Sequence, residues 1–132
     1  MPAVSKTPRW GDLGTLWRYG AVGVAATLSH YMVLVAGVEL AHWPAWVASG
    51  VGAVVGAQVA YAGNRWFTFG HTGTLGASWG KFQFISLVGA GVGMAIVAAL
   101  VALHLHYLLA QVTATVLTML LTYQLNRLWT FR

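Results

Sequence analysis

The chain has 132 residues, of which 58% are hydrophobic and 7% charged, with a formal net charge of +5 and two acids, Asp12 and Glu39. Soluble domains carry about 25% charged residues, so this chain is predicted to be an integral membrane protein. The lack of cysteine excludes disulfides, thiolate metal sites and cysteine nucleophiles. The basic residues flank apolar stretches instead of forming a polar patch, which argues against nucleic-acid binding.

The first 17 residues form a short polar lead. Trp10, Leu13 and Trp17 share one face if this lead is helical, which indicates a cytoplasmic or interfacial segment with its indoles at headgroup depth. An irregular tail fits the lead equally well. No short apolar core with a small-residue cleavage site is present, so a removable signal peptide is not expected.

Four apolar stretches follow, each near the roughly 20 residues that a helix needs to cross the hydrocarbon layer. We place them near residues 19–38, 43–63, 82–103 and 107–126. The first and last connections are so short that the spans they join must be antiparallel neighbours. The middle connection, residues 64–81, contains four glycines and predicts a flexible loop. The expected fold is an all-α integral membrane protein with four transmembrane helices.

Lysine and arginine indicate the orientation. They all lie on the side shared by the N-terminus, the middle loop and the C-terminus: Lys6, Arg9, Arg18, Arg65, Lys81, Arg127 and Arg132. Because cytoplasmic loops carry an excess of these residues, both termini are predicted to be cytoplasmic. We expect a multi-pass protein of the cytoplasmic (inner) membrane.

A six-residue pattern occurs twice, each time at the end of an apolar span. The copies are Asn64-Arg65-Trp66-Phe67-Thr68-Phe69 and Asn126-Arg127-Leu128-Trp129-Thr130-Phe131, and a tyrosine, Tyr61 or Tyr123, stands three residues ahead of each. This repetition predicts two direct-repeat helical hairpins, residues 18–69 and 81–131, joined by a loop at 70–80. The chain is then a single transmembrane domain.

Both copies of the pattern carry an arginine one helical turn after the tyrosine, on the same face. Such an arginine either binds a lipid phosphate through its fork of donors or only anchors the helix within an aromatic belt. The candidate phosphate-binding residues are Arg65, Arg127, Asn64, Asn126, Lys81 and Arg18. The candidate aromatic interface comprises Tyr61, Trp66, Phe69, Tyr123, Trp129 and Phe131.

Several polar side chains fall inside the spans, where an unpaired polar group is costly. The candidates for an intramembrane polar groove are His30, Gln58, Gln111, Thr115, Thr118 and Thr122. The last four follow one face of the fourth span and either line a cavity or act in packing, since threonine can bond its own helix. His30 is either a neutral imidazole bonded to a neighbouring helix or a ligand- or proton-binding residue. No second His, Asp or Glu lies at comparable depth, so a metal site is not expected.

Small residues are spaced for close helix contact. Gly52, Gly56 and Ala60 form one ridge, and Gly89 and Gly93 form another. In lipid, close backbone approach at glycine favours helix association. The ridges serve either packing within the bundle or self-association.

The chain resembles the GtrA-like family of small membrane proteins over residues 18–131. The resemblance rests on both copies of the six-residue pattern and on two stretches of the first span, Arg18-Tyr19-Gly20-Ala21-Val22-Gly23 and Ala26-Thr27-Leu28-Ser29-His30. It implies a four-span protein of cell-surface polysaccharide synthesis. His30 matches a family position that is often His, Asn or Asp, whereas the second half has Ala95 there, so the halves are not equivalent.

Two functions follow from this resemblance. The first is translocation of polyprenyl-phosphate-linked sugars, as a flippase or flippase subunit, with Arg65 and Arg127 as natural partners of the phosphate. The second is a non-transporting adaptor that recruits or stabilises a membrane glycosyltransferase. We expect no cofactor, and we expect a homo-oligomer because four helices enclose little space.

Two other classes are disfavoured. A small proton-coupled antiporter needs a carboxylate inside the first helix, but Glu39 stands at the end of that span. An enzyme needs an acid–base or nucleophile–base pair, and the sequence offers none at recognisable spacing.

Overall fold

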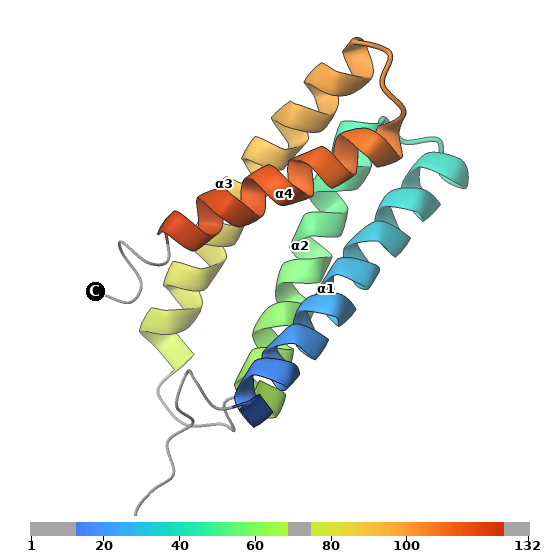
Figure 1. Cartoon of the computed structure of the whole chain (residues 1–132). Coiled ribbons are helices and arrows are strands. Elements are labelled where there is room, and N and C mark those ends of the chain that lie inside the picture. The colour runs from blue at the N-terminus through green and yellow to red at the C-terminus, as the bar shows by residue number, and fades with distance from the viewer. Residues whose placement is uncertain (1–12, 69–74, 126–132) are drawn as a thin grey trace, which may run out of the picture.

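The structure, a computed structural model, describes residues 13–68 and 75–125. Its elements are α1 (Leu13–Glu39), α2 (Ala45–Gly63), the π-helical segment η1 (Asn64–Thr68), α3 (Leu75–Ala102) and α4 (Tyr107–Leu125) (Figure 1). No strand occurs in these two ranges, so the expected all-α fold is confirmed.

Three helices of the described part are long and apolar enough to cross a membrane. The corresponding segments are Trp17–Glu39, Ala45–Phe67 and Trp79–Ala102, and α4 carries a shorter apolar stretch, Tyr107–Thr122. The chain is therefore a multi-pass membrane protein. The membrane orientation of its ends stays a prediction.

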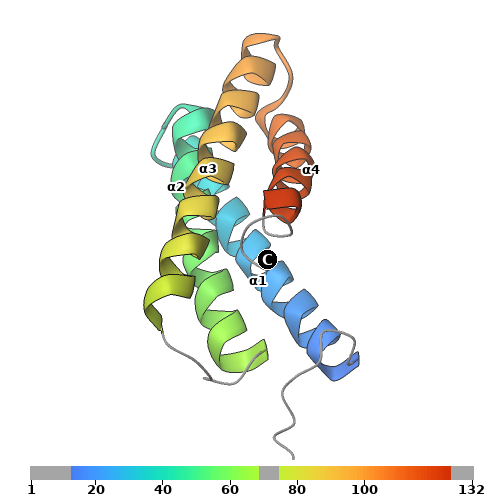
Figure 2. The ribbon, with the colours of Figure 1, turned by 90° about the vertical axis from the view of Figure 1, so that its left-hand side faces the viewer.

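Consecutive helices pack side by side: α1 along α2, α2 along α3, and α3 along α4. α4 is tilted across the bundle, so that it starts beside the C-terminal end of α1 and leaves α1 as it proceeds (Figures 1 and 2). The first and last helices therefore meet only near one end. This divergence opens a space between α1 and α4.

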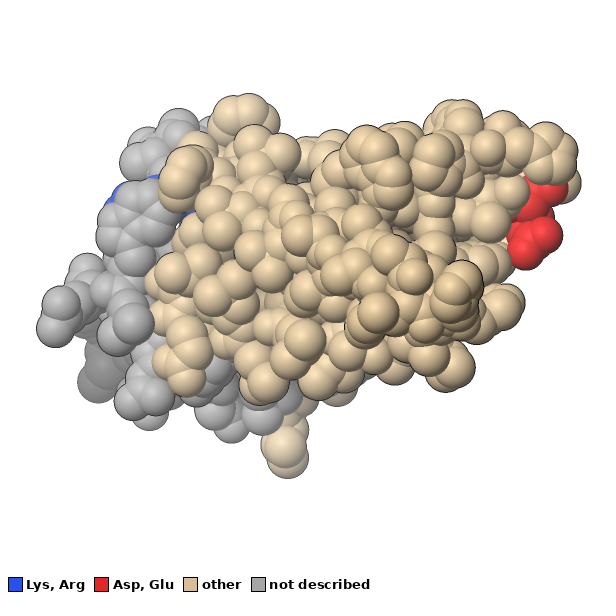
Figure 3. All heavy atoms as spheres, turned by 90° about the horizontal axis from the view of Figure 1, so that it is seen from above, with Lys and Arg blue, Asp and Glu red and all other residues tan. Residues whose placement is uncertain are grey.

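The two ends of the bundle differ in charge. The basic end holds Arg18, η1 and the start of α3, whereas the turn end holds Glu39 and the two short connections; Figure 3 shows the Lys and Arg atoms at the opposite end from the acidic atoms. At the turn end the Tyr107 hydroxyl donates a 2.8 Å hydrogen bond to Glu39. Glu39 thus ties the start of α4 to the end of α1.

Both short turns pass through a left-handed residue, His42 with φ 57° and His104 with φ 66°. The same number of residues separates these two histidines as separates Asn64 from Asn126. The shared spacing is what a duplicated hairpin predicts. The direct-repeat relationship itself, with its division at residues 18–69 and 81–131, stays a prediction.

Two expected boundaries need correction. The middle connection is shorter than a loop over 64–81, because η1 continues α2 and α3 already begins at Leu75. Gly76 and Gly80 lie inside α3, where a glycine costs about 1 kcal/mol relative to alanine but does not forbid the helix. Leu13 and Trp17 belong to α1 itself and form no separate lead helix, while Trp10 lies outside the described residues.

The glycine ridges pack within the bundle. A Cβ built on Gly52 would lie 2.6 Å from Cδ2 and 2.6 Å from the backbone oxygen of His30, and one on Gly56 would lie 2.9 Å from the backbone oxygen of Ala26. α1 and α2 are therefore in backbone contact, as small-residue ridges permit in membranes. On the other ridge, a Cβ on Gly89 would lie 3.1 Å from the Thr122 methyl group.

Candidate functional site

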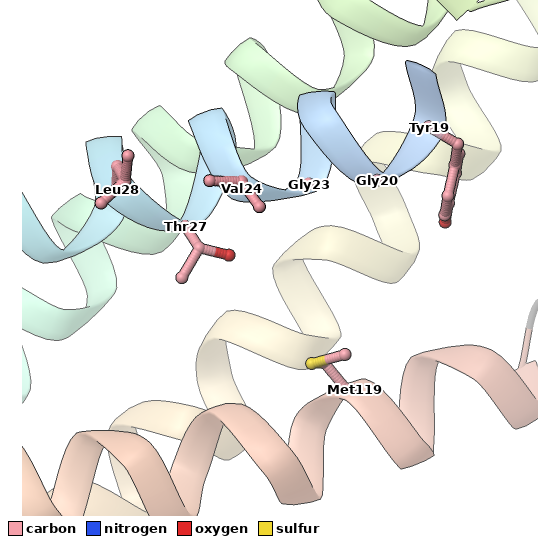
Figure 4. Close-up of a pocket in the computed structure, with 7 residues that line it drawn as sticks. All are labelled: Tyr19, Gly20, Gly23, Val24, Thr27, Leu28 and Met119. Carbon is pink, nitrogen blue, oxygen red and sulfur yellow. The ribbon is translucent and has the colours of Figure 1, made fainter. Parts of the chain in front are cut away.

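A groove of about 410 Å³ runs between α1 and α4 where the two helices diverge (Figure 4). Its walls are mainly apolar, and six of the seven lining residues come from α1: Tyr19, Gly20, Gly23, Val24, Thr27, Leu28 and, from α4, Met119. The α1 residues recur at helical spacing and so share one face. Where α4 diverges, this face of α1 packs against no other helix and is open toward lipid.

Two glycines keep this groove wide. A Cβ built on Gly20 or Gly23 would meet nothing within 4 Å, unlike one on Gly52. Glycine inside a helix costs about 1 kcal/mol relative to alanine, and no helix contact in the described structure requires it at these two positions. The two glycines therefore leave open space on this face of α1.

Side-chain hydrogen bonds join the helices on the turn-end side of the groove. The Tyr31 hydroxyl and Thr115 Oγ1 are 2.9 Å apart and join α1 to α4. Behind them, Ser49 donates a 2.6 Å bond to Oε1 of Gln111, and Nε2 of Gln111 donates to Thr115 at 3.2 Å. Ser49 and Gln111 are each 2% exposed. This polar cluster fastens the first half of α4 and leaves the second half free to diverge.

The other end of the groove lies beside an arginine. The Arg18 guanidinium stands 5.4 Å from the centroid of the Phe67 ring, and Nη1 donates a long bond of 3.5 Å to the Phe67 carbonyl. Trp17 meets the same ring edge-on at 5.7 Å. Because arginine has five donors, one long bond leaves most of the fork available to an anion. Arg18 directly precedes the lining residue Tyr19 in the chain, but its side chain packs on Phe67 of η1 and is not part of the groove lining.

The structure brings only part of the expected phosphate set together. Arg18 from α1 contacts η1, which contains Asn64 and Arg65, and Lys81 lies near the start of α3 at the same end. Asn126 and Arg127 lie outside the described residues. The role of this whole set stays a prediction, and Arg18 is the member whose contact with η1 the structure shows.

The expected aromatic interface is seen only in its first half. Tyr61 packs against Phe82 of α3 with ring centroids 5.5 Å apart, and Trp66 is exposed. Phe69, Trp129 and Phe131 lie outside the described residues, as does the side chain of Tyr123.

The six expected groove residues do not line one groove. His30 packs on Gly52 between α1 and α2, where the Ser49 backbone interacts with its imidazole but Nε2 finds no partner of hydrogen-bonding geometry among the described residues. Gln58 forms a reciprocal amide pair with Gln83 of α3, at 2.8 and 3.2 Å.

The stripe on α4 divides between two environments. Thr118 and Thr122 each donate to a carbonyl of their own helix at 2.8 Å, and their methyl groups face Gly93 and Gly89 of α3. Gln111 and Thr115 instead belong to the polar cluster at the closed end of the groove. These contacts are those of packing residues, and a role of the stripe in lining a cavity stays a prediction.

Sequence reasoning gave no role to the residues that form the walls of the groove. Gly20, Gly23 and Thr27 share one helical face, a signal that was available from their spacing alone. Met119 carried no such signal, because its position opposite α1 depends on the tilt of α4.

A second groove, of about 340 Å³, lies between α2 and α3 and contains no polar side chain. Its lining is Val47, Gly50, Val51, Val54, Leu87, Ala90, Gly91 and Met94. It lacks the hydroxyl groups that line the α1/α4 groove. Within the described residues there is also no group of His, Cys, Asp or Glu that could hold a metal ion.

Comparison with known proteins gives one family match. The model of the family described as GtrA/DPMS, transmembrane domain, matches residues 18–132. Neither a search of curated proteins nor a search of solved structures finds a match.

Proposed function

Since this chain belongs to the GtrA/DPMS transmembrane domain family, we propose that it translocates polyprenyl-phosphate-linked sugars across the cytoplasmic membrane. It acts there as a flippase or flippase subunit for cell-surface polysaccharide or glycan synthesis. Family membership supports involvement in handling lipid-linked sugars. The observation that carries the finer proposal is the lipid-open groove between α1 and α4. Arg18 precedes the lining residue Tyr19 at the basic end of α1.

The groove suits the two chemically different parts of such a lipid. A prenyl chain is apolar and can lie against Val24, Leu28 and Met119 without losing contact with the bilayer. The phosphate is anionic and can accept hydrogen bonds from the Arg18 fork at the basic end. With the basic end in the cytoplasm, as the lysine and arginine distribution predicts, the lipid enters from the cytoplasmic leaflet.

Removal of the Arg18 side chain should weaken binding of a polyprenyl phosphate roughly tenfold or more, the loss typical of a hydrogen bond to a charged group. The measurement is lipid binding to purified Arg18→Ala by native mass spectrometry. Arg18 is exposed and makes one long hydrogen bond, so the fold should survive the change.

Arg18→Lys is the matched control, because it keeps the charge but loses the fork, and we expect an intermediate affinity. In the same assay, Arg65→Ala and Arg127→Ala measure how much each copy of the six-residue pattern contributes to lipid binding. Equal binding by Arg18→Ala and the wild type would show that the phosphate is held elsewhere.

Translocation itself is tested with a labelled polyprenyl-phosphate sugar in proteoliposomes that contain the purified protein. We expect movement of the label between leaflets that depends on the protein and is slowed by Arg18→Ala. If protein-free and protein-containing vesicles behave alike, the chain is no autonomous flippase.

The adaptor function keeps one structural argument in its favour. The groove is closed at the Tyr31–Thr115 bond and so forms no continuous passage in this conformation. An adaptor would need only the lipid site and an exposed helix face. Co-purification of a membrane glycosyltransferase from native membranes, together with loss of its activity when this protein is removed, would favour the adaptor.

A further inference from the structure

The hydroxyl of Thr27 differs in its hydrogen bonding from most other serine and threonine hydroxyls described in the helices. Most serine and threonine hydroxyls described within the helices bond back to their own helix, as Ser29 does to Ala25 at 2.8 Å and Thr113 does to Leu109 at 3.0 Å. Thr27 Oγ1 and Ser86 Oγ have no hydrogen-bond partner among the described residues. Ser86 is half-buried on α3, whereas Thr27 is exposed in the groove.

Figure 4 shows the Thr27 side chain projecting from α1 into the gap toward α4. An unpaired hydroxyl facing hydrocarbon is costly, and threonine can avoid that cost by bonding its own helix. Thr27 does not use this alternative. Its polar atom is therefore available to a group that enters the groove.

Tyr31 lies one helical turn further along the same face and offers a second polar atom. Either hydroxyl can be the donor in the 2.9 Å contact between Tyr31 and Thr115, and Thr115 also lies 2.8 Å from the Gln111 carbonyl, to which it can donate. The Tyr31 oxygen keeps its acceptor capacity. Thr27 lines the groove and can donate and accept, and Tyr31, just beyond the lining residues, can accept. The other hydroxyl of the lining, that of Tyr19, lies two helical turns before Thr27, toward the basic end.

From this arrangement we infer that Thr27 and Tyr31 form a contact site for the hydroxyl groups of the sugar, an inference that rests on the proposed translocation. Sugar hydroxyls are donors and acceptors without charge, which matches these two side chains. No charged residue lines this part of the groove, so the site does not suit the phosphate. Hydrogen bonds here replace part of the hydration that the sugar loses inside the membrane.

The depth of the site along α1 implies that it contacts the sugar during translocation and not when the lipid first binds. Thr27 stands nine residues after Arg18 in α1, about 13 Å along the helix axis. A sugar bonded directly to a phosphate held at Arg18 does not reach that far. The sugar meets Thr27 and Tyr31 only after the headgroup has left the mouth of the groove.

The test compares Thr27→Val with the wild type in proteoliposomes, using a polyprenyl-phosphate monosaccharide and the same lipid without sugar. Valine keeps the shape of threonine and removes the hydroxyl. We expect translocation of the sugar lipid to slow roughly fivefold, the factor for one hydrogen bond lost from the rate-limiting state. Movement of the sugar-free lipid, and binding of both lipids in native mass spectrometry, should not change.

Two further variants make the result specific. Thr27→Ser restores a hydroxyl and should restore the rate. Ser86→Ala removes an unbonded hydroxyl that lies outside the groove and should leave the rate unchanged. If Thr27→Val moves the sugar lipid at the wild-type rate, or slows both lipids equally, the inference is overturned while the proposed function stands. If the wild type moves neither lipid, the proposed function fails and the inference fails with it.

Discussion

Replacement of Gly52 by alanine is expected to lower the free energy of unfolding by about 2–3 kcal/mol, near the upper end for overpacking of a well-packed contact. The added Cβ would lie 2.6 Å from both Cδ2 and the backbone oxygen of His30. A side chain could turn away, but the His30 carbonyl is part of α1, so the two helices must separate. Reversible unfolding in mixed micelles, followed by circular dichroism, measures the loss.

Gly20→Ala is the matched control for this change. It makes the same substitution in a helix, but the new Cβ meets nothing within 4 Å. We expect no loss, and a gain of up to about 1 kcal/mol from the better helix propensity of alanine. Equal destabilisation by both variants, or none by Gly52→Ala, would mean that α1 and α2 do not touch as described.

The sequence predicted the elements of this fold well because each depends on local composition. Long apolar stretches identified the helices near their observed positions, and the connection of only a few residues around His42 required an antiparallel hairpin. The ridge of Gly52 and Gly56 was recognised as a packing surface from spacing alone. Its partner, the His30 face of α1, was not, because periodicity defines a face but does not say what lies against it.

The site was harder to predict because it arises from the angle of one helix. The polar stripe of α4 suggested a cavity, yet Thr118 and Thr122 satisfy themselves and present methyl groups to α3. Gln111 and Thr115 instead fasten the start of α4 to α1 and α2, so that the groove opens beyond them. The sequence of α4 does not reveal that tilt. Without knowledge of the tilt, Gly20 and Gly23 cannot be distinguished from other small residues of a membrane helix.

Replacement of Gly23 by leucine is expected to reduce binding of a polyprenyl-phosphate sugar at least tenfold, or about 1.4 kcal/mol, and to reduce translocation with it. A Cβ at Gly23 has open space around it, so the leucine side chain can enter the groove without displacing a neighbour. The fold should be as stable as the wild type or more so, because leucine favours a helix over glycine. Native mass spectrometry and the proteoliposome assay measure the two losses.

Gly91→Leu is the control for Gly23→Leu. It shows whether a loss of lipid binding comes from blocking the α1/α4 groove or from adding a leucine side chain to any open groove. Gly91 lies on α3, lines the second groove between α2 and α3, and also has nothing within 4 Å of a built Cβ. The two variants therefore add the same side chain to two open grooves, only one of which is lined by hydroxyl groups. Loss of lipid binding in Gly23→Leu alone would locate the lipid between α1 and α4. Loss in Gly91→Leu alone would move it to the α2/α3 groove, and the roles proposed for Arg18 and Thr27 would then be wrong.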